Sequence, residues 1–138
     1  MSQLAGKTVI ITGSSRGVGA DTAQILAAQG ANIIVNYRSK APRANKVVKA
    51  IEEAGGHATA VQADVTKPED LTNLVNVAIE TYGSLDYLIL NASGGMEAGM
   101  GEDYAMRLNR DAQLNLARLA AEKMPNGGRI VFVTSHQA

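Results

Sequence analysis

Short apolar runs alternate with longer amphipathic segments along nearly the whole chain of 138 residues. The runs lie at residues 8–11, 32–35, 58–61, 87–90 and 130–133. Their near-continuous apolar character is typical of strands that are covered on both faces, as in a parallel sheet. The alternation therefore predicts an α/β fold in which a helix crosses over between each parallel strand and the next.

The segments between the runs show helical periodicity. Helices are predicted within residues 18–30, 42–56, 66–83 and 102–124, and glycines close the first three. Thr66 and Glu69 predict a capping box at the start of the third helix. The expected apolar faces are, in chain order, Val18, Thr22, Ile25 and Leu26; Ala44, Val47, Val48 and Ile51; Leu71, Leu74, Val75, Ala78, Ile79 and Tyr82; and Ala105, Leu108, Ala112, Leu116 and Leu119.

The composition excludes several classes of function. Lysine plus arginine and aspartate plus glutamate number 13 each, which argues against binding to nucleic acid or to a membrane surface. The chain has no cysteine, so disulfides and thiolate zinc sites are excluded, and we expect no metal site. No apolar run is long enough to cross a bilayer, and the first strand follows the N-terminus too closely for a signal peptide. We expect one cytoplasmic domain over residues 1–138.

The stretch TGSSRGVG, residues 12–19, joins the first predicted strand to the first predicted helix. Glycines allow a tight turn and let backbone N–H groups approach an anion, and the helix N-terminus adds partial positive charge. The spacing of Gly13, Gly17 and Gly19 matches neither the G-x-G-x-x-G fingerprint nor a P-loop. The context predicts a dinucleotide loop; the alternative is a glycine-rich turn that binds nothing.

Four further stretches follow the loop in a recognisable order. They are residues 63–65 (Ala-Asp-Val), residues 91–94 (Asn-Ala-Ser-Gly), Asn109, and residues 134–135 (Thr-Ser). With these stretches, the chain resembles the short-chain dehydrogenase/reductase family. The resemblance implies a Rossmann-type doubly wound parallel sheet of strand order 3-2-1-4-5. It also implies hydride transfer between a nicotinamide cofactor and a small-molecule carbonyl/alcohol pair.

The resemblance assigns roles to individual residues. Those it implies for binding the diphosphate, the adenine and the nicotinamide ribose are Gly13, Ser15, Arg16, Gly17, Val18 and Gly19; Asp64 and Val65; and Asn91, Ala92, Ser93 and Gly94. Ser135 is expected to hydrogen-bond the substrate oxygen and Asn109 to order a water in a proton relay. Each has a plainer alternative, in which Ser135 closes a strand, Asn109 is a core amide, Asp64 caps a turn and Asn91 satisfies backbone at a strand end.

The segment after the second strand bears on the choice of cofactor. An acid about twenty residues past the glycine loop is usual for NAD, but Tyr37, Arg38 and Ser39 stand there. A carboxylate about 4 Å from a 2′-phosphate would cost on the order of 4 kcal/mol at an effective dielectric constant near 20. An arginine reverses the sign. The sequence therefore favours NADP over NAD, with Arg16 and Arg38 on the phosphate; the alternative is that both arginines are solvated surface residues.

One expected element of the family is missing. Its proton donor is a tyrosine followed four residues later by a lysine, and none of the four tyrosines here has a lysine at that spacing. The fifth strand would also be an apolar edge of the sheet. We expect the chain to be inactive alone and to form the N-terminal part of a longer protein, lacking the family's C-terminal strands. The resemblance implies a homo-oligomer for that protein.

Two other functions are alternatives to the enzyme. The first is a non-catalytic dinucleotide-binding sensor or scaffold domain, which the missing tyrosine and lysine favour. The second is a phosphate-responsive receiver-like domain. That domain would need an acid cluster at the end of the first strand, where Thr12 and Gly13 stand instead.

Overall fold

The computed structural model describes residues 4–13, 17–39, 41–64, 67–91, 102–124 and 128–133. The elements in these residues are β1 (Thr8–Ile11), α1 (Gly17–Ala28), β2 (Asn32–Tyr37), α2 (Ala41–Glu53), β3 (His57–Gln62), α3 (Pro68–Tyr82), β4 (Tyr87–Asn91), α4 (Glu102–Lys123) and β5 (Arg129–Val133). The strands form one parallel sheet in the order β3-β2-β1-β4-β5. The predicted fold class and strand order are confirmed.

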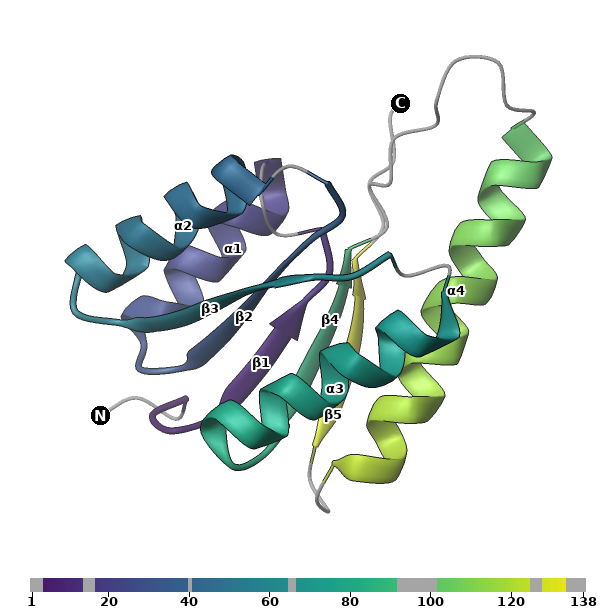
Figure 1. Ribbon diagram of the computed structural model, residues 1–138. Coiled ribbons are helices and arrows are strands. Elements are labelled where there is room, and N and C mark those ends of the chain that lie inside the picture. The colour runs from purple at the N-terminus through teal and green to yellow at the C-terminus, as the bar shows by residue number, and fades with distance from the viewer. Residues whose placement is uncertain are drawn as a thin grey trace.

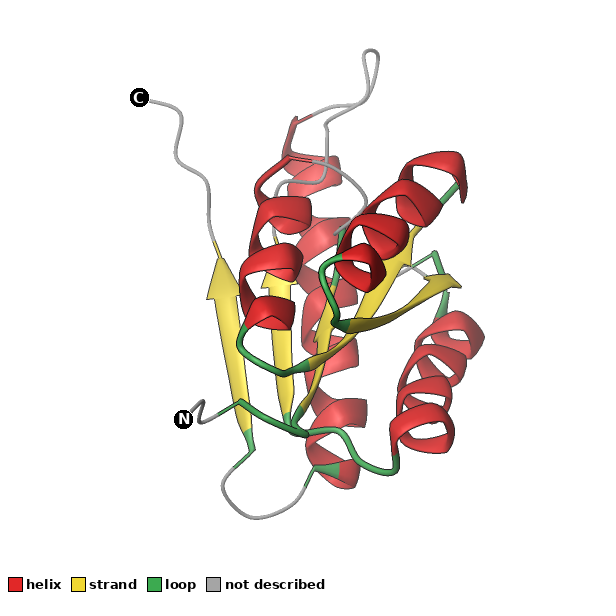
Figure 2. Ribbon diagram, turned by 90° about the vertical axis from the view of Figure 1, so that its left-hand side faces the viewer, coloured by secondary structure: helices red, strands yellow, loops and turns green. Residues whose placement is uncertain are grey.

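Helices cover both faces of the sheet. Helices α1 and α2 lie on one side and α3 and α4 on the other (Figure 1). Figure 2 shows the same layers from the side. Alternate residues of β1 serve the two cores: Val9 and Ile11 pack with the α1 and α2 residues, and Ile10 packs with those of α3 and α4. Because side chains alternate across a strand, residues 9–11 of the central strand must all be apolar to serve both cores.

The direction of chain progression reverses at β1. From β1 the chain continues to β2 and β3 on one side, then returns to place β4 and β5 on the other. Ile11 pairs with Val35 of β2 and with Ile89 of β4, so the three strands end at a common edge. In open α/β sheets, ligands bind outside the carboxyl ends of the strands at such a switch point. The glycine turn that follows β1 therefore lies where a ligand is expected.

The first helix corrects one prediction. Its buried residues are Ala20, Ala23 and Ala27, whereas Ile25, placed on the apolar face from the sequence, is 59% exposed. Leu26 is only partly buried. The pattern of large apolar residues was misleading because the face that contacts the sheet is made of alanines, whose small side chains allow close packing of helix on sheet.

The start of α3 corrects a second prediction. Its N-cap is Lys67, which makes no side-chain capping bond, so the expected capping box of Thr66 and Glu69 is wrong; Thr66 itself lies outside the described residues. The reason is Pro68, which is favoured as the first helical residue and forces extended backbone on the residue before it. Lys67 accordingly has φ −107° and ψ 119°.

The end of α3 agrees with the sequence. Gly83 caps the helix at φ 88°, and its N–H donates to the Ile79 carbonyl at 2.7 Å. A left-handed backbone of this kind is open to glycine and strained for other residues. The glycine therefore turns the chain towards the start of β4.

A buried aspartate joins three strands at the amino edge of the sheet. One carboxylate oxygen of Asp86 accepts hydrogen bonds from the Thr8 N–H and the Ser84 hydroxyl, both at 2.9 Å. The Asp86 N–H donates to the Thr8 carbonyl, and the Arg129 N–H donates to the Asp86 carbonyl, both at 3.0 Å. The starts of β1, β4 and β5 are thus held by a residue that is 8% exposed. No pattern in the sequence predicted this role.

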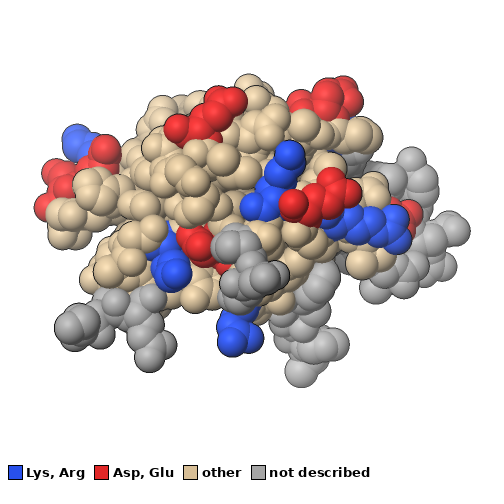
Figure 3. Space-filling view, turned by 90° about the horizontal axis from the view of Figure 1, so that it is seen from below, with Lys and Arg blue, Asp and Glu red and all other residues tan. Residues whose placement is uncertain are grey.

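The outer strand β5 carries apolar surface, as expected. Val131 is 45% exposed, and β4 is the neighbour of β5 in the sheet of the described residues. Figure 3, a view from below, shows lysines and arginines interspersed with acids, with neither sign gathered into a patch. Within the described residues, no helix combines the length and apolar character needed to span a membrane.

Candidate functional site

The glycine turn lies at the carboxyl end of the central strand. Thr12 is buried and its N–H donates to the Ile89 carbonyl at 3.0 Å, which continues the pairing of β1 with β4. Gly13 then adopts φ 62°, a left-handed conformation that disfavours any other residue. Helix α1 begins at Gly17, and Gly19 is buried. The order of strand, glycine turn and helix N-terminus is that of an anion site.

Part of the predicted loop cannot be placed. Ser15 and Arg16 lie outside the described residues, as does the side chain of Val18. The roles predicted for these residues in binding the diphosphate and the 2′-phosphate stay predictions. The geometry of the site is therefore built from Gly13 and from the ends of the neighbouring strands.

A buried amide connects the turn to the two strands beside it. Asn36 of β2 accepts a hydrogen bond from the Gly13 N–H at 3.1 Å through its Oδ1. Its Nδ2 donates to the carbonyls of Ala63 at 3.3 Å and Val61 at 3.5 Å. This residue was not predicted from the sequence, although a polar residue directly after three apolar ones near the end of a strand was the available signal.

The segment after Asn36 carries the predicted 2′-phosphate residues. Tyr37 is partly buried against the α1 and α2 core, whereas Arg38 and Ser39 are exposed. Two hydrogen bonds hold its backbone: the Ala63 N–H donates to the Tyr37 carbonyl at 2.9 Å, and the Gln62 side chain donates to the Arg38 carbonyl at 3.2 Å. The segment directly after β2 thus carries the guanidinium group of Arg38, and no residue from 36 to 39 carries a carboxylate.

The predicted adenine segment follows β3 at the same edge. Asp64 is partly buried, and its backbone N–H donates to the Asp70 carboxylate at 2.8 Å. Asp70 lies in the first turn of α3, where a negative charge is favoured by the helix dipole. The bond fixes the chain between β3 and α3. Val65 lies outside the described residues.

The residues predicted for the nicotinamide end and for catalysis are placed only in part. Asn91 ends β4 and pairs with Val133 of β5, and Asn109 lies within α4, but their side chains lie outside the described part. Ala92, Ser93, Gly94 and Ser135 are not among the described residues. The ends of β4 and β5 lie at the edge that also holds Gly13, which is the arrangement the predicted roles require.

The described residues thus place a glycine turn, a buried amide and an exposed arginine at one edge of the sheet. Such an edge can hold an extended dinucleotide across the switch point, with anionic groups against backbone N–H groups and a guanidinium. Among the residues that the structure describes, no group of three or more His, Cys, Asp or Glu residues could hold a metal ion.

A comparison with known families decides what kind of protein carries this edge. The model of the short chain dehydrogenase family matches residues 7–138. The chain belongs to this family. The match extends over all five strands of the described residues, so the resemblance seen in the sequence is confirmed.

Individual relatives support this assignment to the family. The chain is 39% identical over 140 residues to a probable tetrahydroxynaphthalene reductase of Zymoseptoria tritici, covering 97% of this chain and 52% of the relative. A short chain dehydrogenase of Burkholderia cenocepacia in complex with NADP has 37% identity and a TM-score of 0.82, over 95% of this chain and 56% of that one.

A third relative binds the other cofactor. A 7α-hydroxysteroid dehydrogenase in complex with NADH and 7-oxo glycochenodeoxycholic acid has 32% identity and a TM-score of 0.83, over 96% of this chain and 54% of that one. The chain therefore spans about half the length of the relatives it matches. Structural neighbours of the family are found with NADP and with NADH.

Proposed function

We propose that this chain forms the NADP(H)-binding part of an oxidoreductase that interconverts a carbonyl and an alcohol. Family membership leaves the choice between the two cofactors open, because one solved neighbour holds NADP and another holds NADH. The observation that carries the proposal is the exposed Arg38 at the end of β2, where an NAD enzyme would have an acid.

The residues present fit such a cofactor. Gly13 makes a left-handed turn at the start of the loop, and α1 directs its N-terminus to the same edge. Arg38 supplies a guanidinium group on backbone that two hydrogen bonds hold in place. In the proposal the glycine loop binds the diphosphate, Arg16 and Arg38 bind the 2′-phosphate, and residues 64–65 flank the adenine.

Hydride transfer is the chemistry that NADP(H) supplies when bound. In the proposal, residues 91–94 orient the nicotinamide ribose at the end of β4. Ser135 holds the substrate oxygen by a hydrogen bond, and Asn109 orders a water for proton transfer. No tyrosine of this chain has a lysine four residues later, so we propose that these 138 residues bind cofactor without turnover.

A non-catalytic dinucleotide-binding role is the second candidate, and the same tyrosine pattern favours it. Both candidates require NADPH binding, and both predict no turnover by these 138 residues alone. Incubation of the chain with NADPH and a panel of small carbonyl compounds tests this shared expectation. Binding with no NADPH oxidation is expected, and oxidation coupled to carbonyl reduction would contradict the absence of turnover.

The substitution Arg38→Asp tests the choice of cofactor. It replaces attraction for the 2′-phosphate by repulsion, so the NADPH affinity should fall at least about 30-fold, or about 2 kcal/mol. The NADH affinity should change far less. Isothermal titration of both cofactors into both proteins gives the two ratios.

Arg118→Asp is the matched control, because Arg118 is an exposed arginine near the end of α4, which leads to the start of β5. It makes the same charge change on the surface and should leave the ratio of NADPH to NADH affinity unchanged. An unchanged ratio in Arg38→Asp, or an equal fall in both variants, would show that Arg38 does not bind the 2′-phosphate.

A further inference from the structure

The Asn36 side chain has an unusual setting for a polar residue. It is 3% exposed and lies on β2, between the glycine turn of β1 and the end of β3. It makes hydrogen bonds to the backbone of both neighbours, to Gly13 on one side and to Val61 and Ala63 on the other. One side chain therefore links the ends of three strands.

The chemistry of these bonds requires an amide. The Gly13 N–H needs an acceptor, and the carbonyls of Val61 and Ala63 need a donor. A carboxylate of the same shape accepts but does not donate, so it would face two carbonyl oxygens with a negative charge. An apolar residue does neither, so the Gly13 N–H and the two carbonyls would lose this partner. The three hydrogen bonds therefore require a side chain that both donates and accepts.

Each of the three strand ends leads to a segment of the proposed cofactor site. Gly13 begins the glycine loop, Ala63 precedes Asp64, and Asn36 itself precedes the segment that carries Arg38. We propose that Asn36 is a positioning residue for the cofactor, one that sets the glycine turn relative to Arg38 and Asp64. This inference rests on the proposed function, and it adds a residue that need not touch the cofactor.

The substitution Asn36→Asp should make the hydrogen bonds at position 36, and with them cofactor binding, dependent on pH. A protonated carboxyl group donates and accepts as the amide does, whereas the carboxylate has lost its donor. Burial beside two carbonyl oxygens raises the pKa of the introduced carboxyl above its ordinary value of about 3.9. Binding should therefore be close to that of the original chain at low pH and weaken as the pH rises through that pKa.

The measurement is the NADP⁺ dissociation constant of Asn36→Asp divided by that of the original chain, by calorimetry from pH 5 to pH 8. Titration of the 2′-phosphate affects both proteins and cancels in the ratio. We expect the ratio to rise about tenfold over this range, the effect of losing one buried hydrogen bond. A ratio that stays near one from pH 5 to pH 8 would overturn the inference.

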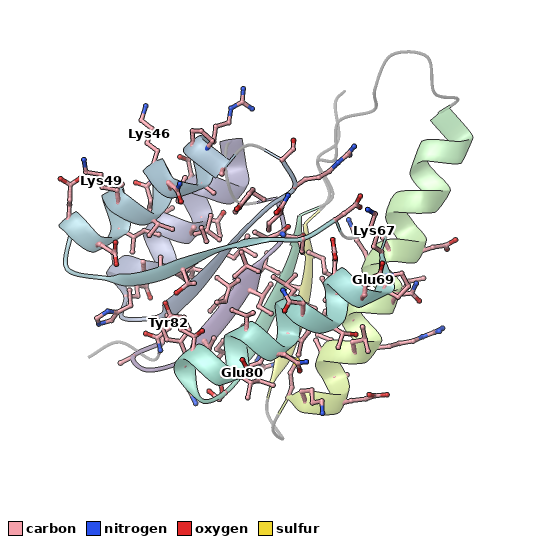
Figure 4. The ribbon with its side chains drawn as sticks, viewed as in Figure 1. Lys46, Lys49, Lys67, Glu69, Glu80 and Tyr82 are labelled. Atoms are coloured by element: carbon pink, nitrogen blue, oxygen red, sulfur yellow. The ribbon has the colours of Figure 1, made fainter. Side chains whose placement is uncertain are left out.

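Two further variants separate positioning from a general loss of stability. Tyr82→Phe removes a different side-chain tie to β3, the 2.8 Å hydrogen bond between the Tyr82 hydroxyl and Thr59. Tyr82 extends from α3 towards β3, well away from the strand ends at the glycine turn (Figure 4). Its NADP⁺ affinity should equal that of the original chain at every pH, although its thermal stability should fall.

If the aspartate variant does not fold at high pH, Asn36→Ser tests whether the Asn36 amide positions the cofactor site. The shorter hydroxyl cannot link both neighbours, so its NADP⁺ affinity should fall by about tenfold at all pH values. Affinity equal to that of the original chain would overturn the inference. Failure of the original chain to bind NADP⁺ would instead refute the proposed function, so the two failures are distinguishable.

Discussion

In the described residues, a buried polar side chain joins neighbouring strands at each edge of the sheet, and the two side chains differ in chemistry. At the amino edge, the Asp86 carboxylate only accepts, and its partners are an N–H and a hydroxyl. At the carboxyl edge, the Asn36 amide accepts from one strand and donates to another. Both side chains satisfy backbone groups that pairing between the strands leaves over.

The difference lies in what each edge leads to. The backbone of Asp86 also bonds the backbone of Thr8 and of Arg129. The starts of the neighbouring strands are therefore held by backbone hydrogen bonds as well as by the Asp86 side chain. Asn36 leads instead to a glycine turn and to an exposed arginine. In the proposal, a buried polar side chain stabilises the fold at one edge of the sheet and sets the geometry of a ligand site at the other.

The largest effect on stability is expected from Asp86→Ala. It leaves the Thr8 N–H and the Ser84 hydroxyl without their acceptor, so the free energy of unfolding should fall by about 3 kcal/mol. Urea unfolding followed by circular dichroism measures it. Asp86→Asn keeps an oxygen in place and should lose no more than about 1 kcal/mol. Equal losses in the two variants, or weaker NADP⁺ binding by the folded alanine variant, would break the distinction.

A pair of glycines sharpens the comparison. Gly13 at the carboxyl edge has φ 62°, and Gly83, which ends α3 at the other edge, has φ 88°. Alanine at either position should destabilise the fold by about 1–2 kcal/mol, because both require left-handed backbone. At Gly83 an added methyl group meets no atom within 4 Å.

The two alanine variants should differ in binding. Thermal unfolding should show similar losses of stability, but only Gly13→Ala should weaken NADP⁺ binding in a calorimetric titration. Equal affinities in the two variants would show that the shape of the turn at Gly13 does not matter to the cofactor. Weaker binding by Gly83→Ala would extend the site to the amino edge.

The smallest effect is expected at Thr8, which is fully buried. In the described part of the chain, its Oγ1 is the buried side-chain atom that has no hydrogen-bond partner. Thr8→Val removes that hydroxyl and keeps the N–H that Asp86 binds, so the free energy of unfolding should rise by about 1 kcal/mol. A loss of stability in the same urea experiment would mean that the hydroxyl is satisfied in solution.

Much of the fold was predictable because it depends on local patterns. Apolar runs and helical periodicity located every strand and helix, and Gly83 ended α3 as expected. The face of α1 was wrong because alanines, which carry little hydrophobic signal, make its contact with the sheet. The capping box was wrong because the preference of Pro68 for the first helical position outweighed it.

The two buried ties were not predictable for a different reason. Asn36 bonds a residue 23 positions away, and Asp86 bonds one 78 positions away. A single sequence shows a polar residue beside an apolar run but not the partner that the fold brings to it. The glycine loop and Arg38 could be proposed for phosphate binding because a glycine turn before a helix and an arginine after a strand are local features of the sequence.

The most direct test of the account is a nuclear magnetic resonance titration of the ¹⁵N-labelled chain with NADP⁺. The account predicts the largest shifts in the backbone amides of Gly13, Arg38 and Asp64 and in the side-chain amide of Asn36. The amides of Thr8 and Asp86, at the opposite edge, should hardly move. Shifts centred on the amino edge, or none at all with excess NADP⁺, would contradict it.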